Sequence, residues 1–317
     1  MIPPACLVLL SCIGLLQPTQ QPSPNTSTKP LGNEREFVPG LRIDWSIPRI
    51  EVDAKVVLRK GPLELFACSP QTREHESIVI TKPRPLHLFQ AMGLIGLEPG
   101  TPVRYDKDNE RWDPPTGSAV RISVRHQRNG ETRIDPIESW LLNVKTGKPT
   151  EPIEWIFAGS LRMEGNRFAA DFDGTIICVV NFETAIIAPK SLHSADNEAL
   201  WLAANTDAIP EIGQSCVILI EPVVPARGIR VSVRSDGTMT RQGAGISAAD
   251  IARLFPRGQG KSEKQNPEVV FIVEDGISED KLNAIIESLT SLGLDRSWLK
   301  IEKSASGDKT APSPPGG

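Results

Sequence analysis

The sequence of 317 residues has no basic surplus. Its 35 Lys and Arg residues are outnumbered by 39 Asp and Glu residues, and the net charge of -4 leaves no cationic excess to neutralise phosphate groups. Surfaces that bind nucleic acid typically have clusters of Lys or Arg interleaved with aromatic residues, and this sequence has no such cluster. We therefore expect no nucleic-acid partner.

Tyrosine is nearly absent, with one residue, whereas the chain has 28 prolines and 25 glycines. Such a composition indicates many turns and excludes a helical bundle. The length allows about two domains, since single domains usually have ~100–200 residues.

Long apolar segments are also missing. The apolar run from Ala5 to Leu16 is shorter than the ~20 residues that a membrane-spanning helix needs. Residues 1–20 therefore suggest a signal peptide, and the segment ending at Cys12 resembles a lipobox, which would make Cys12 a lipidated N-terminus. An uncleaved anchor or a cytoplasmic chain are the remaining alternatives, and export to the periplasm is the expectation.

Two segments have almost no apolar residues. Residues 21–37 are rich in Pro, Ser, Thr and Asn and are expected to be a disordered linker that holds a folded domain away from a membrane. Residues 304–317 have a similar composition and are expected to be a disordered tail.

The region 38–224 shows repeated short runs in which apolar and polar residues alternate. This period of two, clear in residues 49–57 and 119–126, is typical of strands with one face on a core. Asn129-Gly130 and Asp173-Gly174 each predict a hairpin turn. We expect a β-rich domain.

The stretch from Gly61 to Asp106 contains most of the reactive side chains. Residues 63–67 and 77–81 predict two strands, and the polar loop between them carries the candidate residues. A helix is expected to begin near Pro85 and to end before Gly96.

This stretch, GPLELFACSPQTREHESIVI followed by a short helix and LEPGTPVRY, resembles the YdjY-like domain of bacterial envelope proteins. The similarity extends from about residue 40 to about residue 222. It implies a fold neighbourhood and a place in the cell envelope, but no established activity.

The region 226–303 has a different pattern. Strands are expected on both sides of Asp236-Gly237, helices are expected after Ser247 and Ser278, and the order β-β-α-β-α-β predicts a small two-layer α/β domain. The whole chain is thus expected to be α+β.

The segments VSVRSDGTMTRQGAGISAADIARL and VVFIVEDGISEDKLNAIIESLTSLGL resemble the periplasmic domain of ExbD/TolR-type proteins. That family has a transmembrane helix with an embedded Asp, whereas the apolar run near the N-terminus here has no acidic residue. The resemblance therefore does not imply proton-driven energy coupling.

Cys68, His75 and Glu76 are the candidates for chemistry. A thiolate, an imidazole and a carboxylate can bind zinc or form a nucleophile with its base. The C-x6-H-E spacing matches no closed zinc pattern, and a fourth ligand would have to be His87, His193 or Asp171. The alternative, which we favour, is a structural loop in which His75 packs over the strand pair; no catalytic residue or cofactor is assigned.

Three cysteines remain outside the signal segment, namely Cys68, Cys178 and Cys216. They are expected to be free and packed in the core, since each is flanked by apolar residues; one disulfide with one free thiol is the alternative.

The function expected from the sequence is that of an exported, membrane-tethered envelope protein that binds or assembles with another envelope protein. The alternative is a metal- or thiol-dependent enzyme that uses Cys68, His75 and Glu76.

Overall fold

The computed structural model describes residues 34–45, 47–224, 228–255 and 268–304. The signal segment expected over residues 1–20 and nearly all of the expected tail lie outside these residues. The linker was expected to reach residue 37, but the first strand begins at Glu34. Its backbone pairs with the strand Leu41–Asp44 in an antiparallel hairpin, which supplies hydrogen-bond partners that the polar composition did not reveal.

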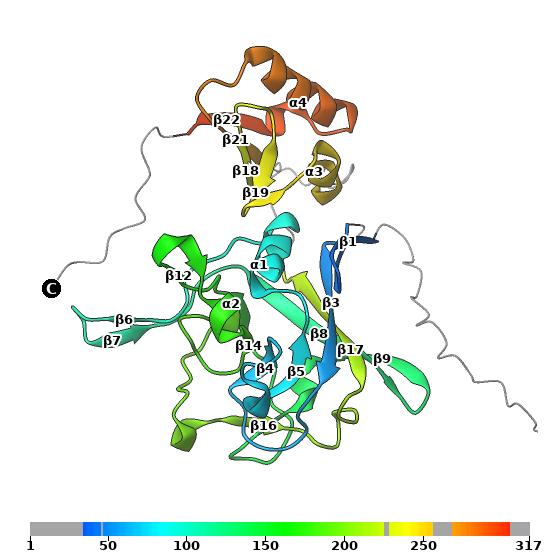
Figure 1. The fold of residues 1–317 in the computed structure, drawn as a ribbon, viewed down its shortest axis with the longest axis vertical. Coiled ribbons are helices and arrows are strands. Elements are labelled where there is room, and N and C mark those ends of the chain that lie inside the picture. Colours follow the sequence, from blue (N-terminus) through cyan, green and yellow to red (C-terminus); the bar gives the residue numbers. More distant parts are fainter. Residues whose placement is uncertain (1–33, 46, 225–227, 256–267, 305–317) are drawn as a thin grey trace, which may run out of the picture. The chain divides into compact units, whose positions relative to one another are not determined.

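Eight strands close into a barrel in the order β3-β17-β8-β11-β15-β14-β4-β5, and β5 pairs back onto β3 (Figure 1). Full closure leaves no free edge along this ring. The strands of the barrel are β3 (Arg49–Val56), β4 (Leu65–Cys68), β5 (Ser77–Thr81), β8 (Ala119–Arg128), β11 (Trp155–Phe157), β14 (Thr175–Cys178), β15 (Ile187–Pro189) and β17 (Ser215–Pro222).

Alternation of side chains along β8 shows why the sheet has an inner and an outer surface. Val120, Ile122 and Val124 are buried, whereas Arg121, Ser123 and Arg125 alternate with them on the opposite face. Successive side chains of a strand point to opposite faces, so the period-two pattern of the sequence becomes one apolar wall of the core. The β-rich expectation for this region is confirmed.

The outer surface of the barrel carries a buried charge. Glu51 on β3 has no exposed side-chain surface and pairs with Arg125 on β8. Arg42 and Arg49 lie 3.7 and 3.6 Å from its carboxylate oxygens. A buried carboxylate is tolerated because these guanidinium groups and hydrogen bonds replace water.

Two strands of the barrel extend beyond it and pair with additional strands. One half of β3 pairs with β2 (Leu41–Asp44), which pairs with β1 (Glu34–Val38), and one half of β8 pairs with β9 (Glu131–Pro136). Asn129 and Gly130 join β8 to β9 with φ angles of 53° and 80°. Positive φ at both central residues is the requirement of a tight hairpin turn, so this predicted turn is confirmed.

The predicted helix is present as α1 (Pro85–Leu94). Proline occupies its first turn, where no backbone donor is lost, and Gly96 follows its end with a φ of 91°. Phe89 of α1 lies 5.4 Å from the ring of Phe157 and 5.1 Å from that of Phe168. The helix therefore packs its aromatic face onto the barrel.

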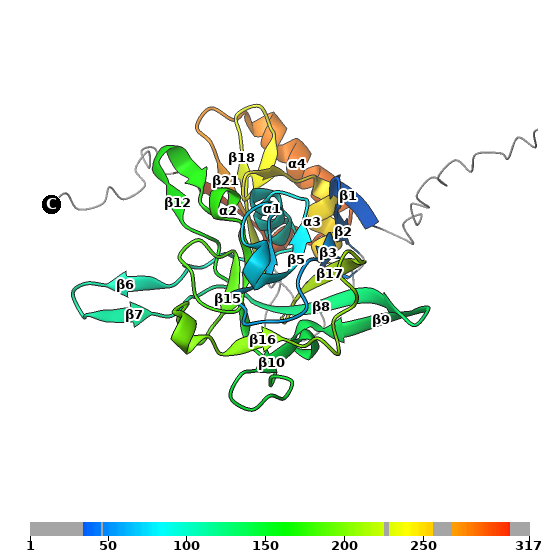
Figure 2. The same cartoon turned by 60° about the horizontal axis from the view of Figure 1, so that its bottom comes forward.

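The connections between barrel strands contain further short elements. The hairpin β6–β7 pairs only within itself and extends away from the barrel (Figure 2). These elements are β6 (Arg104–Asp106), β7 (Arg111–Asp113), η1 (Glu74–Glu76), η2 (Ile137–Trp140), β10 (Leu141–Asn143), β12 (Arg162–Met163), η3 (Glu164–Asn166), β13 (Arg167–Phe168), α2 (Ala170–Asp173), η4 (Asn197–Ala199) and β16 (Leu202–Ala204).

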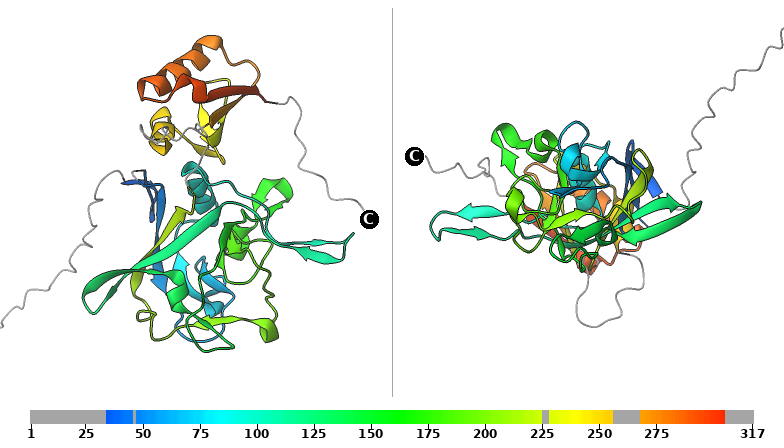
Figure 3. Two further views of the ribbon diagram at one scale, coloured as in Figure 1. Left: turned by 180° about the vertical axis from the view of Figure 1, so that it is seen from behind. Right: turned by 90° about the horizontal axis from the view of Figure 1, so that it is seen from below.

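A second sheet follows after residue 227, with the order β20-β19-β18-β21-β22. β18, β21 and β22 are parallel, and two helices, α3 and α4, contact each other beside this sheet (Figure 3). Its elements are β18 (Gly228–Val233), β19 (Met239–Arg241), β20 (Ala244–Gly245), α3 (Ala248–Leu254), β21 (Glu268–Val273), α4 (Glu279–Ser291), η6 (Arg296–Trp298) and β22 (Leu299–Lys303).

Both helices of this region begin at the serines named by the sequence. The hydroxyl of Ser247 accepts from the backbone N of Asp250, whose carboxylate accepts in return from the backbone of Ser247. Ser278 caps α4 by accepting from the backbone N of Lys281. Such caps satisfy backbone donors that have no partner within the helix.

Arg241 on β19 is a buried cation, with only 3% of its surface exposed. Its guanidinium group donates to the carbonyl oxygens of Gly93 and Leu97 near the end of α1, and to the carboxylate of Glu98 at 2.7 Å. A positive charge is favourable beside the C-terminal carbonyls of a helix.

Taken together, the described elements confirm an α+β chain that is rich in strands.

The barrel core can be tested with two substitutions of the same residue type. Ile218→Ala on β17 removes a side chain that is 1% exposed, and we expect a loss of about 2–5 kcal/mol in the free energy of unfolding because a cavity remains. Ile134→Ala on β9, at a position that is 56% exposed, should cost less than ~1 kcal/mol. Urea denaturation measures both, and equal losses would contradict this description of the core.

Candidate functional site

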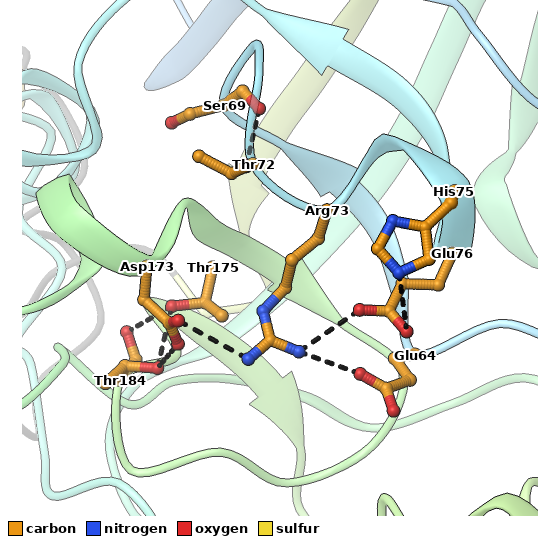
Figure 4. Close-up of polar contacts among 9 residues, drawn as sticks. All are labelled: Glu64, Ser69, Thr72, Arg73, His75, Glu76, Asp173, Thr175 and Thr184. Carbon is orange, nitrogen blue, oxygen red and sulfur yellow. Dashed lines mark hydrogen bonds and ion pairs between the residues drawn. The ribbon is translucent and has the colours of Figure 1, made fainter.

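The polar loop that carries the candidate residues joins two neighbouring barrel strands. β4 ends at Cys68, the chain turns through η1, and β5 begins at Ser77 as a parallel neighbour of β4. Because β4 and β5 are parallel, the connection must cross from the end of one strand to the start of the other. On the way, the loop runs beside the end of α2 and the start of β14. Side chains from these elements meet around Arg73 (Figure 4).

Arg73 is the centre of an ion-pair network. Its Nη1 lies 2.9 Å from a carboxylate oxygen of Glu64 and 3.1 Å from one of Glu76, and its Nη2 lies 3.4 Å from Asp173. The guanidinium also lies over the ring of Phe182, 4.8 Å from its centroid. One arginine thus holds together the approach to β4, the loop itself and the end of α2.

A second layer of hydrogen bonds fixes Asp173. The hydroxyl of Thr184 donates to the other carboxylate oxygen of Asp173 at 2.7 Å. Thr175 on β14 donates in turn to the carbonyl oxygen of Thr184 at 2.8 Å. These bonds hold the Asp173 carboxylate in place for Arg73, as Figure 4 shows.

Three carboxylates share the one guanidinium group of Arg73. Burial, followed by the nearby charge of Glu76, raises the pKa of Glu64, although Arg73 opposes the shift. A raised pKa means that the folded chain disfavours the ionised form of this carboxyl group. Its contribution to the free energy of unfolding therefore falls as the pH rises towards and through that pKa. Arg73 limits this loss at neutral pH.

Gly174 ties the loop to the end of α2. It ends the helix with a φ of 75°, and its carbonyl accepts from the backbone N of Ser69 at 3.1 Å. A Cβ atom at this position would lie 2.2 Å from the hydroxyl of Thr72. The hairpin predicted at Asp173-Gly174 is therefore wrong: the same two residues end a helix, because a left-handed glycine serves both kinds of turn.

The structure does not bring Cys68, His75 and Glu76 together as a ligand set. Cys68 is fully buried, His75 has 78% of its side chain exposed, and Glu76 is engaged with Arg73. His75 Nε2 lies 3.8 Å from Glu76, which makes an ion pair only when the ring is protonated. Among the described residues, no group of three or more His, Cys, Asp or Glu side chains is placed to hold a metal ion.

The three residues considered for a fourth ligand are engaged elsewhere. His87 packs edge-on against Phe37, and burial lowers its pKa. Asp171 pairs with Arg84 and accepts from the backbone N of Leu86 at 2.9 Å, which anchors the start of α1. His193 lies in a separate loop, where its ring stacks on Trp201.

All three cysteines of the folded region are free and buried, as the core-cysteine interpretation expected, and no disulfide joins them. Burial raises the pKa of Cys68, raises that of Cys178 well above its ordinary value and raises that of Cys216 to about 12. A nucleophilic cysteine needs the thiolate form near neutral pH. These thiols are therefore unsuited to catalysis.

The sequence alone predicts no site role for Arg73, Glu64 or Asp173. Arg73 is the only Lys or Arg in the loop segment TREHE, and a lone arginine among acids indicates a shared ion-pair partner. No local pattern linked it to Asp173, because the two residues lie 100 positions apart in the chain.

Comparison with known proteins supports the assignment of this barrel. A family model described as the YdjY domain matches residues 41–221, which is more than half of the chain. The chain belongs to the YdjY family. The matched residues begin at β2 and end within β17, so the YdjY domain corresponds to the barrel and the loop around Arg73. No curated protein and no solved structure matches the chain.

The role of Arg73 in this YdjY domain can be measured by replacing it with an uncharged residue. Arg73→Met should lower the free energy of unfolding by about 2–3 kcal/mol at pH 7, because three carboxylates then lose their shared partner. The loss should shrink towards pH 4, where protonation of those carboxylates removes their repulsion.

Arg104→Met is the matched control, since Arg104 is paired with Asp113 but its side chain is 70% exposed. Its effect should stay below ~1 kcal/mol. Chemical denaturation at several pH values measures both variants. A loss in Arg73→Met that does not change with pH would contradict the electrostatic explanation.

The side chain of His75 is 78% exposed. This exposure corrects the expectation that His75 packs over the strand pair. We therefore expect His75→Ala to change the free energy of unfolding by less than ~0.5 kcal/mol. Elemental analysis should show the same zinc content in the purified wild type and in the variant. Zinc that is near-stoichiometric in the wild type and lost in His75→Ala would show that the loop is a metal site.

Proposed function

We propose that this YdjY-family chain is an exported, membrane-tethered protein of the cell envelope that acts by binding or assembly rather than by catalysis. The observation that carries this proposal is the state of the loop around Arg73. Arg73 engages the carboxylates of Glu64, Glu76 and Asp173, and the thiol of Cys68 is buried with a raised pKa, whereas the exposed ring of His75 lies apart from that thiol. A loop of this kind supports a scaffold, whereas a catalytic loop keeps a reactive group open to a substrate.

The tether is inferred from the sequence near the N-terminus. A short apolar run followed by a polar, proline-rich segment is typical of a signal peptide or lipoprotein signal and its spacer. Among the described residues, no helix is both long and apolar enough to cross a membrane. The proposed attachment rests on the sequence of residues 1–20, with Cys12 as the lipidated residue in the lipoprotein form.

The C-terminal region supports the assembly role by its resemblance to ExbD/TolR-type periplasmic domains. It combines three parallel strands, an antiparallel edge formed by β19 and β20, and two helices capped by serines. We include this likeness in the proposal as a second binding module, for which another envelope protein is the expected partner. The resemblance carries no catalytic residue with it.

Export can be tested with paired reporters fused after Lys29. Alkaline phosphatase, which is active only outside the cytoplasm, should be active in the fusion, and β-galactosidase should be inactive, because residues 1–20 direct the chain across the membrane. The same fusions without residues 2–20 are the control and should show the opposite activities. Activity of β-galactosidase alone in the complete fusion would end the proposal of export.

The form of the tether is tested by Cys12→Ser in the full chain. A lipoprotein should move from the membrane fraction to the soluble periplasmic fraction, because the lipidated cysteine is lost. An uncleaved apolar anchor should stay in the membrane fraction in both forms.

A further inference from the structure

A shallow pocket with a volume of about 310 Å³ is lined by none of the residues around Arg73. Its walls come from β10, from residues 150–154 and from the loop before β16, which pairs with β10. Residues that line it are Asn143, Glu151, Ile153, Ser191, His193 and Trp201. This volume is at the small end of the ~300–1,000 Å³ range of ligand pockets.

Two stacked aromatic rings form one wall of this pocket. The imidazole of His193 and the indole of Trp201 are nearly parallel, with centroids 3.8 Å apart and planes 6° apart. The Trp201 Nε1 donates to the carbonyl of Val179 at 2.8 Å, and the backbone N of His193 donates to Asn181 Oδ1 at 2.6 Å. The rings are thus held in place before any ligand arrives, which lowers the entropic cost of binding.

The polar groups around the rings offer hydrogen bonds, and the charged ones among them are the carboxylates of Glu151 and Glu154. Ser191 Oγ lies 2.8 Å from Nε2 of His193, and burial lowers the pKa of His193, so the ring is neutral at pH 7. The carboxylate of Glu154 is paired with Lys190 at 2.8 Å. No arginine is among the described residues that line the pocket, which disfavours phosphate and other anions.

We propose that this pocket binds an uncharged, hydroxylated ring, that is, one sugar unit. A sugar ring presents apolar C–H groups on its flat face, which would pack on the His193–Trp201 stack, and hydroxyl groups at its edge, which suit Ser191 and Asn143. A free saccharide and a polysaccharide strand share this chemistry. The inference does not depend on export, because it uses only the folded residues.

The test uses the indole N–H signals of the six tryptophans in a nuclear magnetic resonance titration of the full chain. The signal missing from Trp201→Phe identifies Trp201, and Trp112, which is 52% exposed on β7, is the internal reference. Soluble oligomers of N-acetylglucosamine should shift the Trp201 signal and leave that of Trp112 in place. No shift of Trp201 up to about 10 mM, where binding energies near −3 kcal/mol are detected, would overturn the proposal.

Variants and matched probes decide which chemistry binds. His193→Ala removes one of the two stacked rings and should weaken binding about tenfold. His75→Ala replaces an exposed histidine outside the pocket and should leave the affinity unchanged. Ser191→Ala should weaken binding less, and serves if His193→Ala does not fold. Equal affinity in all three variants would overturn the proposal.

Two further probes separate the alternatives. Inorganic phosphate, or glucosamine with its charged amine, should not replace N-acetylglucosamine; stronger binding of either would show that charge and not the sugar ring is recognised. Co-sedimentation with insoluble cell-wall polysaccharide then distinguishes the source. Pelleting that His193→Ala abolishes indicates a polysaccharide strand, whereas binding of soluble oligomers alone indicates a free saccharide.

Discussion

Closure of the sheet through the pairing of β5 with β3 is the contact on which the rest of the YdjY domain depends. β3 pairs along one edge with β17 and along the other with β2 and then β5, so a single strand completes the ring and begins its extension. Once β5 is held there, β4 must lie beside it in parallel, and the loop between them is placed at one end of the barrel. The position of every residue around Arg73 follows from that closure.

The network around Arg73 shows how a loop rich in reactive residue types can have a structural role. Thiol, imidazole and carboxylate groups are all within nine positions of one another, yet burial raises the pKa of Cys68, and solvent surrounds His75. The carboxylates meet a guanidinium group instead of a metal ion. Ion pairs of this kind are strong when several share one partner and the site is partly dry.

The pocket beside Trp201 has the opposite character. Its rings are fixed by bonds to the backbone and to Asn181, and polar side chains, including the carboxylates of Glu151 and Glu154, lie around them. Binding sites usually combine a rigid apolar surface with a few oriented polar groups, whereas the loop around Arg73 uses its polar groups internally. In this domain, the loop with the candidate reactive residues and the pocket with the stacked rings are thus different places.

The sequence by itself determined most of the barrel strands, the helix α1, the turn at Asn129-Gly130 and the caps at Ser247 and Ser278, because each depends on neighbouring residues and on a local period. It did not reveal β1, whose polar residues are typical of a linker. Only the tertiary structure decided barrel closure, the partners of Arg73 and the stack of His193 on Trp201. These contacts join residues far apart in the chain, as Arg73 and Asp173 are, and no local pattern carries that information. The Asp173-Gly174 pair shows the limit, since the same local turn chemistry suits a hairpin and a helix end, and in the structure Gly174 ends α2.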